Sequence, residues 1–458
     1  MDEPYAAKVR PSFWKRRVPA WTIAGLVCGL AVIGGILWYG QANGTVSLFR
    51  HAPIPFPNLE FGASPSLANA DHFNTVKNQL VAEGATFIEA DLTAMVLRVY
   101  KEGQVAHTVP ILTKGREGSW WETPAGVYRI EWKSKNHFSS FGRVYSPWSM
   151  AFQGNFFIHG WPYYPDGTPV SSQFSGGCIR LSDEDAKAVY DLVEVGTPVI
   201  VFEQDSEDDG FDYVKKRPDV TAEAFLAADL RSNSVLAEKD SKKNVPTSSL
   251  AKFVTALVAA EHLNLDKAVR IAPSMIVETS RPRLVPGQSV QAFQLLYPLL
   301  MESSNEAAEA FAQNVGLVRF VDLMNRKAAA IGMTATQFAD PAGRTPESVS
   351  TAEDLFVLLK YIHNNRSFVL KISTGELRES AYGAPIYPDL VNGNDFRVTD
   401  ADFLGGKMGE ASASGTAAIA VYDLTIRGEK RPIAFVLLDP RDVRADMQEM
   451  VAHVLREY

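Results

Sequence analysis

A run of 19 residues without a single charge, Trp21 to Tyr39, constrains this chain of 458 residues more than any other feature. About 20 apolar residues in a helix suffice to cross the hydrocarbon core of a bilayer. Trp21 lies at one end of the run, and Trp38 and Tyr39 lie at the other, where interfacial aromatic residues are expected. Basic residues outnumber acidic ones before the run, so the positive-inside rule keeps the N-terminus cytoplasmic.

We therefore expect a single-pass cell-membrane protein whose catalytic parts are extracytoplasmic. Residues 1–18 form the cytoplasmic tail, 19–40 the transmembrane anchor and 41–84 a spacer. A cleaved signal peptide is the alternative, since Gly40-Gln41-Ala42 loosely fits a small-x-small cleavage site, but the apolar run is long for one. A buried core helix is disfavoured, because no polar residue interrupts the run to make an outward face.

Charge and motif content exclude several classes of function. The formal net charge is -8, which argues against a nucleic-acid partner. The histidines are scattered without ligand spacing, and neither a phosphate loop nor a dinucleotide fingerprint occurs, so we expect no metal and no cofactor.

An acidic stretch over residues 203–212, with six carboxylates, divides the remaining chain. Such a charge run is typical of a solvated linker, although an acidic docking tail is the alternative. We place the linker at 205–220, between a domain at 85–204 and a domain at 221–458. The first reads mostly as strand, and the second alternates strands and helices, which favours α+β. In the spacer, before the first domain, we expect a lead-in helix over 72–83. In the first domain we expect strands over 95–100, 105–112, 127–132, 156–159 and 199–202, and a helix capped by Ser182. In the second we expect a hairpin over 225–236, helices over 249–263, 292–316, 351–362 and 442–458, and strands over 417–426 and 432–438.

Cys178 is a lone thiol among glycines, in Ser175-Gly176-Gly177-Cys178-Ile179-Arg180-Leu181. The other cysteine, Cys28, lies in the apolar run, so no intrachain disulfide is plausible and a nucleophile is indicated. His159 ends an apolar strand and is the candidate base that would make Cys178 a thiolate. The N–H groups of Gly177 and Cys178 could form an oxyanion hole. The simpler alternative is a buried structural cysteine beside a strand-end histidine.

This pattern, His159-Gly160 followed by Ser-Gly-Gly-Cys-Ile-Arg-Leu, resembles the signature of L,D-transpeptidases of the YkuD type. The resemblance covers residues 86–203 and includes Thr123-Pro124-Ala125-Gly126 and Ser146-Pro147-Trp148-Ser149-Met150. It implies Cys178 as nucleophile, His159 as base and the Gly160 carbonyl as the group that orients the imidazole. One departure is Gly176, where many members have histidine.

The implied reaction is acyl transfer on peptidoglycan stem peptides. Cys178 attacks the L-centre carbonyl of the diaminoacid and expels D-Ala, and the amine of a second stem resolves the thioester as a 3→3 crosslink. Arg180 would pair with a substrate carboxylate or brace the loop. Trp161, Tyr163 and Tyr164 either wall the substrate channel or are ordinary loop aromatics.

A second constellation begins at Ser249 and Lys252, which are three residues apart and share one helix face. A partly desolvated lysine there can act as base to the serine. Ser303-Ser304-Asn305 and Lys407-Met408-Gly409 follow in chain order. Together they resemble the S-x-x-K, S-x-N and K-T-G set of penicillin-binding enzymes, specifically low-molecular-mass D-alanyl-D-alanine carboxypeptidases, over residues 222–458.

That resemblance implies Ser249 as nucleophile, Lys252 as base, Ser303 as proton relay and Asn305 as the group that orients the stem. Lys407 would add positive potential beside Gly409, and the N–H groups of Ser249 and Glu410 would form the oxyanion hole. The departure is Met408, because a thioether cannot give the hydrogen bond that the family's threonine gives the substrate carboxylate. Losing one charge-assisted hydrogen bond costs roughly 1.5–3 kcal/mol. The negative charge of Glu410 further opposes an anionic substrate.

We thus expect a multidomain chain: a transmembrane helix, a mostly-β L,D-transpeptidase-like domain and an α+β penicillin-binding domain. The expected function is cell-wall crosslinking, with trimming of pentapeptide stems by the second domain and β-lactams as inhibitors. The alternatives are hydrolytic release of D-Ala or protein anchoring at Cys178, a non-catalytic peptidoglycan-binding second domain, and a β-lactam-hydrolysing enzyme.

Overall fold

The computed structural model describes residues 72–116, 119, 121–140, 142–172, 174–203, 217–375, 385–387, 389–394, 402–411 and 415–458. All of them lie in one compact unit, Phe56–Tyr458. Within these ranges no helix has the length and apolar character that a membrane span requires. The tail expected over 1–18, the anchor over 19–40 and most of the expected linker lie outside the described residues.

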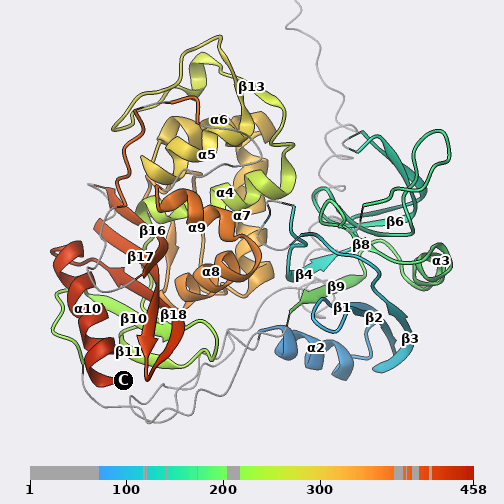
Figure 1. Ribbon diagram of the computed structural model, residues 1–458, viewed down its shortest axis with the longest axis horizontal. Helices are drawn as coiled ribbons and strands as arrows, with labels where there is room; N and C mark the ends of the chain where they lie inside the picture. Colours follow the sequence, from blue (N-terminus) through green and yellow to red (C-terminus); the bar gives the residue numbers. More distant parts are fainter. Residues whose placement is uncertain are drawn as a thin grey trace, which may run out of the picture. The chain divides into compact units, whose positions relative to one another are not determined.

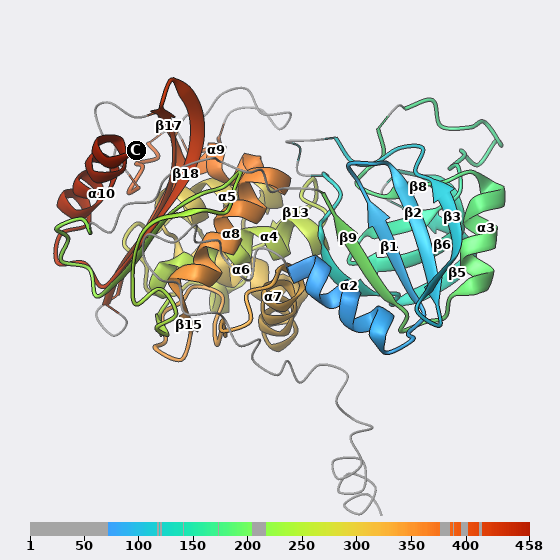
Figure 2. The same ribbon diagram turned by 90° about the horizontal axis from the view of Figure 1, so that it is seen from below.

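The first domain opens with a five-stranded sheet in the order β3-β2-β1-β9-β4 (Figures 1 and 2). Its inner strands β1 and β9 run parallel and are buried on both faces, which explains their apolar sequences. One face packs on helix α2, and the other packs on the domain core. The elements are α2 (His72–Ala82), β1 (Phe87–Asp91), β2 (Val96–Lys101), β3 (Gln104–Pro110), β4 (Gly126–Arg129) and β9 (Pro198–Phe202).

A second sheet, in the order β5-β6-β7-β8, shares that core with the first, so the domain is mostly β, as expected. Helix α3 follows it, and Ser182 caps α3 by accepting a hydrogen bond from the Asp185 N–H, which confirms the predicted cap. The single strand predicted over 127–132 is wrong, because β4 ends at Arg129 and β5 begins in the other sheet. The elements are β5 (Trp132–Ser139), β6 (Val144–Gln153), β7 (Phe156–His159), β8 (Ile179–Arg180) and α3 (Asp183–Leu192).

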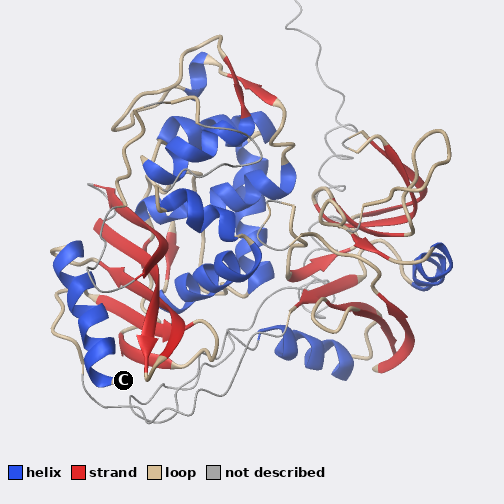
Figure 3. Ribbon diagram, viewed as in Figure 1, coloured by secondary structure: helices blue, strands red, loops and turns tan. Residues whose placement is uncertain are grey.

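The second domain is built on an antiparallel sheet in the order β11-β10-β18-β17-β16. Helix α10 packs on one face, and the other helices, α4 and α8 among them, cover the opposite face, which confirms the α+β expectation (Figure 3). The strands are β10 (Ala224–Asp229), β11 (Val235–Lys239), β12 (Val245–Pro246), β13 (Ala268–Arg270), β14 (Ser289–Gln291), β15 (Val349–Ser350), β16 (Asp402–Ala411), β17 (Gly415–Ile426) and β18 (Glu429–Leu438). The helices are η3 (Ser248–Leu250), α4 (Ala251–His262), η4 (Pro273–Met275), α5 (Ala292–Met301), α6 (Asn305–Val315), α7 (Leu317–Ile331), α8 (Ala352–Asn365), α9 (Ser367–Ser373) and α10 (Val443–Glu457).

The continuous helix predicted over 292–316 is wrong, because the chain breaks between α5 and α6. Ser303 has a positive φ of 58° there, and Ser304 caps α6 by accepting from the Ala307 N–H. Serine competes for backbone hydrogen bonds and favours helix ends, which is the physical reason for the break. Helix α7 was not predicted.

A buried charge cluster joins the two domains. Glu261, Lys327 and Arg366 are buried, and the Glu261 Oε1 atom lies 2.8 Å from Lys327 Nζ and 3.4 Å from Arg366 Nη2. From the first domain, the Gln153 side chain donates to Glu261 Oε2 at 2.9 Å, and the Tyr128 hydroxyl accepts from Lys327 Nζ at 3.0 Å. Buried charges are stable only when they are paired and hydrogen-bonded, so these side chains hold the two domain surfaces together.

Replacing Glu261 by Gln should lower the free energy of unfolding by about 3–5 kcal/mol, because two buried cations lose their anion. Burial opposes ionisation of Glu261, yet Lys327 and Arg366 hold its pKa at about 2. This depressed pKa means that the stabilisation is complete above the pKa of the unfolded chain and is lost as the pH falls towards 2. Urea unfolding of wild type and E261Q should show that their difference in unfolding free energy is smaller at pH 3 than at pH 7.

The matched control is Asp191→Asn, which breaks an exposed i,i+4 pair with Lys187. This change should alter the unfolding free energy by no more than about 0.5 kcal/mol. Equal effects of the two substitutions would contradict a special role of the buried cluster.

Candidate active sites

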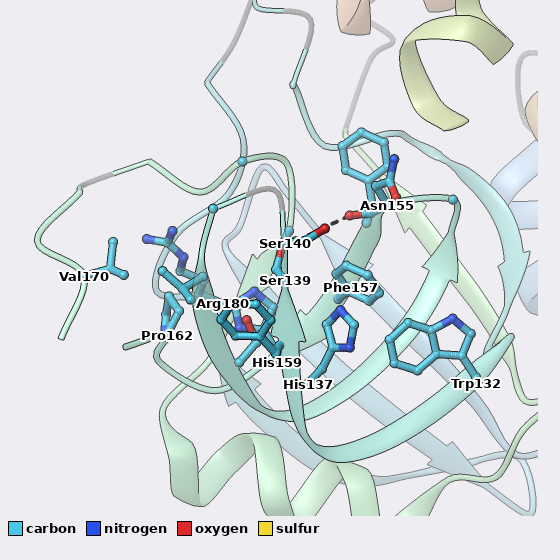
Figure 4. A pocket seen from close by; sticks show the side chains of 18 of the residues that line it. Trp132, His137, Ser139, Ser140, Asn155, Phe157, His159, Pro162, Val170 and Arg180 are labelled. Atoms are coloured by element: carbon cyan, nitrogen blue, oxygen red, sulfur yellow. Dashed lines mark hydrogen bonds between the residues drawn. The ribbon is translucent and has the colours of Figure 1, made fainter. Parts of the chain in front are cut away.

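The pairing of β7 with β8 brings the first set of predicted residues together. Ile158 lies opposite Ile179 in parallel register, and both point into the core. Side chains alternate along a strand, so His159 and Cys178 lie on the other face of the sheet. Both line a cavity of about 530 Å³, which is a typical size for a small-ligand pocket. Figure 4 shows His159 among the residues of this cavity.

The imidazole of His159 is held by its neighbour. Its Nδ1 atom lies 2.6 Å from the Gly160 carbonyl oxygen. A carbonyl can only accept, so Nδ1 carries the proton and Nε2 keeps its lone pair. This geometry matches the role expected of Gly160.

The thiol of Cys178 is partly exposed in the pocket and lies 4.0 Å from the Asn155 carbonyl oxygen. Burial raises its pKa to about 11, although a Phe157 backbone hydrogen bond and Arg180 act in the opposite direction. Burial also lowers the pKa of His159 to about 4. In the absence of substrate these pKa shifts favour the uncharged thiol and the uncharged imidazole near neutral pH.

The loop around the nucleophile contains a hydrogen bond that bears on the predicted oxyanion hole. The Gly177 N–H donates to the Ser175 hydroxyl at 3.1 Å. The oxyanion-binding role expected of Gly177 therefore requires that this bond be shared or exchanged. A Cβ atom added at Gly176 would meet nothing within 4 Å, so close packing does not require glycine at this position.

Arg180 brings an uncompensated positive charge to the pocket. Its guanidinium is mostly buried, donates to the Ser172 carbonyl at 3.1 Å and lies 5.5 Å from the Trp161 ring. No carboxylate of the described residues lies within ion-pair distance of it, so an anionic substrate group could pair with it.

Of the three aromatic residues expected near the channel, Tyr164 lines the cavity. Trp161 instead stacks near Arg180, and Tyr163 stacks on Tyr145. His137 was not predicted. It lines the cavity from β5, packed between the Trp132 and Phe157 rings, and no motif in its segment signals this position (Figure 4).

A raised thiol pKa should be visible in alkylation of the substrate-free protein. Only the thiolate reacts with iodoacetamide, so the rate at Cys178 should rise about tenfold per pH unit from pH 7 and level off only near pH 11. His159→Ala should leave the shape of this profile unchanged. A rate plateau near pH 6–7 in the wild type would instead reveal a preformed thiolate–imidazolium pair.

The second set of residues gathers where η3 runs into α4. Ser249 lies in η3, just before α4 begins, and Lys252 Nζ lies 2.9 Å from its hydroxyl oxygen. Lys252 is fully buried and also donates to the Ala342 carbonyl at 2.8 Å. Burial, together with the charge of Lys407, holds the pKa of Lys252 well below its usual range. A neutral amine at hydrogen-bond distance from a serine hydroxyl is able to act as its base.

Strand β16 runs beside this turn and carries the third motif. Lys407 is buried, and a methyl group added at Gly409 would lie 2.9 Å from the Ser249 nitrogen, so only glycine allows this approach. Met408 packs against the cluster under α10, which is the opposite face of the sheet from Lys407. The thioether therefore does not obstruct the serine site, although it supplies no donor there. The backbone of Glu410 continues β16 opposite Thr416.

Ser303, the first residue of the S-x-N motif, lies at the turn between α5 and α6, where its φ is positive. Its hydroxyl is buried and has no hydrogen-bond partner among the described residues, which leaves it open to a relay role. Asn305 begins α6 and donates from its side chain to the Glu278 carbonyl at 2.8 Å. The substrate-orienting role expected of Asn305 therefore requires that this bond be exchanged.

The buried amine of Lys407 leads us to predict that the rate of acylation at Ser249 depends on pH. Burial lowers its pKa to about 7, so it carries its charge below pH 7 and loses it above. Acylation of Ser249 by a penicillin, which bears a carboxylate, should thus slow between pH 6 and pH 9. Lys407→Ala should react more slowly and lose this dependence. A wild-type rate that climbs through pH 7 would contradict the assignment. Stopped-flow fluorescence with a labelled penicillin measures both.

Family models match both domains. Residues 85–201 match the L,D-transpeptidase catalytic domain family YkuD, and residues 212–438 match the D-alanyl-D-alanine carboxypeptidase family of S11 peptidases. The chain is therefore a peptidoglycan-acting protein with two domains from enzyme families.

Named relatives and a solved structure resemble the second domain. The D-alanyl-D-alanine carboxypeptidase DacB2 of Mycobacterium tuberculosis is 32% identical over 204 residues, which is 43% of this chain and 69% of that protein. A D-alanyl-D-alanine endopeptidase of Escherichia coli is 27% identical over 230 residues, or 49% and 73% of the two chains. A crystal structure of a D-alanyl-D-alanine carboxypeptidase from M. tuberculosis H37Rv has 27% identity, covers 54% of this chain and 95% of its own, and gives a TM-score of 0.44. The chain belongs to the D-alanyl-D-alanine carboxypeptidase family and carries a YkuD-type L,D-transpeptidase domain before it, which confirms both resemblances.

Proposed function

We propose that the chain is a membrane-anchored cell-wall enzyme whose first domain forms 3→3 crosslinks between peptidoglycan stems. The observation that carries the proposal is the shared pocket face of Cys178 and His159, with Nε2 of the imidazole left free to take a proton. The anchor over 19–40 would hold both domains on the outer side of the cell membrane.

The crosslinking reaction then runs in two halves. Nε2 of His159 takes the thiol proton as the sulfur of Cys178 attacks the L-centre carbonyl of the donor diaminoacid. The imidazolium returns this proton to the departing D-Ala amine, which leaves a thioester. The amine of a second stem attacks the thioester, its proton passes to His159, and the thiol is restored. Because the resting groups are neutral, charge develops only during attack, so substrate binding must supply the stabilisation.

For the second domain we propose trimming of terminal D-Ala from pentapeptide stems. Lys252 takes the Ser249 proton as the hydroxyl oxygen attacks the carbonyl of the penultimate D-Ala, and this proton passes to the amine of the departing terminal D-Ala, which leaves an ester on Ser249. Water then hydrolyses the ester, which releases the tetrapeptide and restores the Ser249 hydroxyl. The product tetrapeptide is the donor that the first domain requires, and joining both domains on one chain raises its local concentration. A second candidate is cleavage of crosslinked D-alanyl-D-alanine bonds, because several relatives are named endopeptidases.

Intact-mass spectrometry tests both nucleophiles at once. The protein without residues 1–40 should gain one carbapenem at Cys178 and one penicillin at Ser249. Cys178→Ala should lose the first adduct alone, and Ser249→Ala the second alone. A second domain that never acylates would be a binding module.

Assays with purified muropeptides separate the remaining outcomes. Ser249-dependent conversion of pentapeptide monomers to tetrapeptides indicates carboxypeptidase activity, and cleavage of crosslinked dimers indicates endopeptidase activity. At Cys178, release of D-Ala without dimers would indicate hydrolysis instead of crosslinking.

A further inference from the structure

The cavity around Cys178 is not built by the first domain alone. Ala260 and Leu263, at the C-terminal end of α4 in the second domain, form part of its lining. Leu263 is half-buried, and its remaining surface is available to the cavity. The helix that begins beside Ser249 thus ends at the pocket of the other nucleophile.

The contact between the domains at this point is close and specific. The turn between β6 and β7 lies on the end of α4, where the Asn155 N–H donates to the Glu261 carbonyl at 3.4 Å. Gly154, in the same turn, has a φ of +52°, and a methyl group there would lie 2.4 Å from the same carbonyl oxygen. Only glycine allows the turn to approach α4 this closely.

The same turn continues to the nucleophile. The Asn155 carbonyl is the group that the Cys178 thiol faces at 4.0 Å, and Asn155 itself lines the cavity (Figure 4). Asn155 thus contacts both α4 and the Cys178 thiol, so a displacement of α4 would move a direct neighbour of the sulfur.

We propose that the carboxypeptidase domain completes the substrate pocket of the L,D-transpeptidase domain, with Leu263 as a specificity-determining residue that contacts the donor stem. This inference rests on the proposed acyl transfer at Cys178. The pocket joins one cation, Arg180, to an apolar wall, and no carboxylate of the described residues lines it. That combination fits a peptide that has a free carboxylate and aliphatic groups. The wall from α4 binds the aliphatic part.

The test compares Leu263→Ala with Leu263→Met and with Leu317→Ala in the full-length protein. Leu317 is exposed at the start of α7 and does not line the cavity. The reaction followed is Cys178-dependent exchange of the terminal D-Ala of a tetrapeptide stem for a labelled D-amino acid. We expect Leu263→Ala to lower kcat/KM roughly tenfold, mainly through KM, because apolar contact with the donor is lost. Leu263→Met should restore most of the rate, and Leu317→Ala should match wild type.

Two further measurements distinguish the loss of the Leu263 contact from misfolding of the variant and from an absence of acyl transfer at Cys178. Ser249 acylation by a fluorescent penicillin should stay within twofold of wild type in every variant. A bulky maleimide should label Cys178 several-fold faster in Leu263→Ala, whereas the small reagent iodoacetamide should label it equally fast. Maleimide labelling needs no turnover. A wild type without exchange would therefore defeat the proposed function, whereas unchanged exchange and unchanged maleimide labelling in Leu263→Ala would overturn this inference.

A glycine pair probes the contact itself. Gly154→Ala should slow the exchange, whereas Gly167→Ala should not. Gly167 also has a positive φ, +87°, but nothing lies within 4 Å of an added methyl group. Equal rates for the two variants would show that the turn need not touch α4.

Discussion

The catalytic geometry of the first domain depends on a parallel strand pairing only two residues long. Strand β8 would be too short to stand alone, and it is held by the pairing of Ile179 with Ile158 inside a dry core. Because register decides which face every side chain takes, a slip of one residue would send the thiol into the core and Ile179 into the pocket. The apolar side chains on the buried face of the sheet therefore determine which side chains lie on the pocket face.

The sequence was informative where chemistry is local. Both nucleophiles lie in short motifs, and the Ser182 cap is a contact over three residues, so these features could be predicted. The failures involve non-local packing. Nothing in the segment of His137 indicates that β5 would place it at the pocket. The contact between α4 and the turn at Gly154 joins segments more than a hundred residues apart, which a single sequence cannot reveal.

Burial sets the resting state of both sites in the same way. It disfavours charge on a thiol and on an amine or imidazole alike, so burial lowers the pKa of His159 and that of Lys252 and favours their basic forms. The two nucleophiles differ in what surrounds them. Ser249 already has its base at hydrogen-bond distance, whereas Cys178 faces a backbone carbonyl and carries a raised pKa. The thiol is thus protected from incidental oxidation, since oxidants also react with the thiolate.

Helix α4 sets a fixed length between Ser249 and the wall that Leu263 contributes to the Cys178 pocket. From Ser249 to Leu263 the chain advances 14 residues, which at about 1.5 Å per residue is about 21 Å. A five-residue stem, even fully extended, reaches only about 17 Å. A peptide of this length therefore cannot span the helix from Ser249 to Leu263. The two ends of α4 thus define separate binding places, and a ligand at one end leaves the other end open.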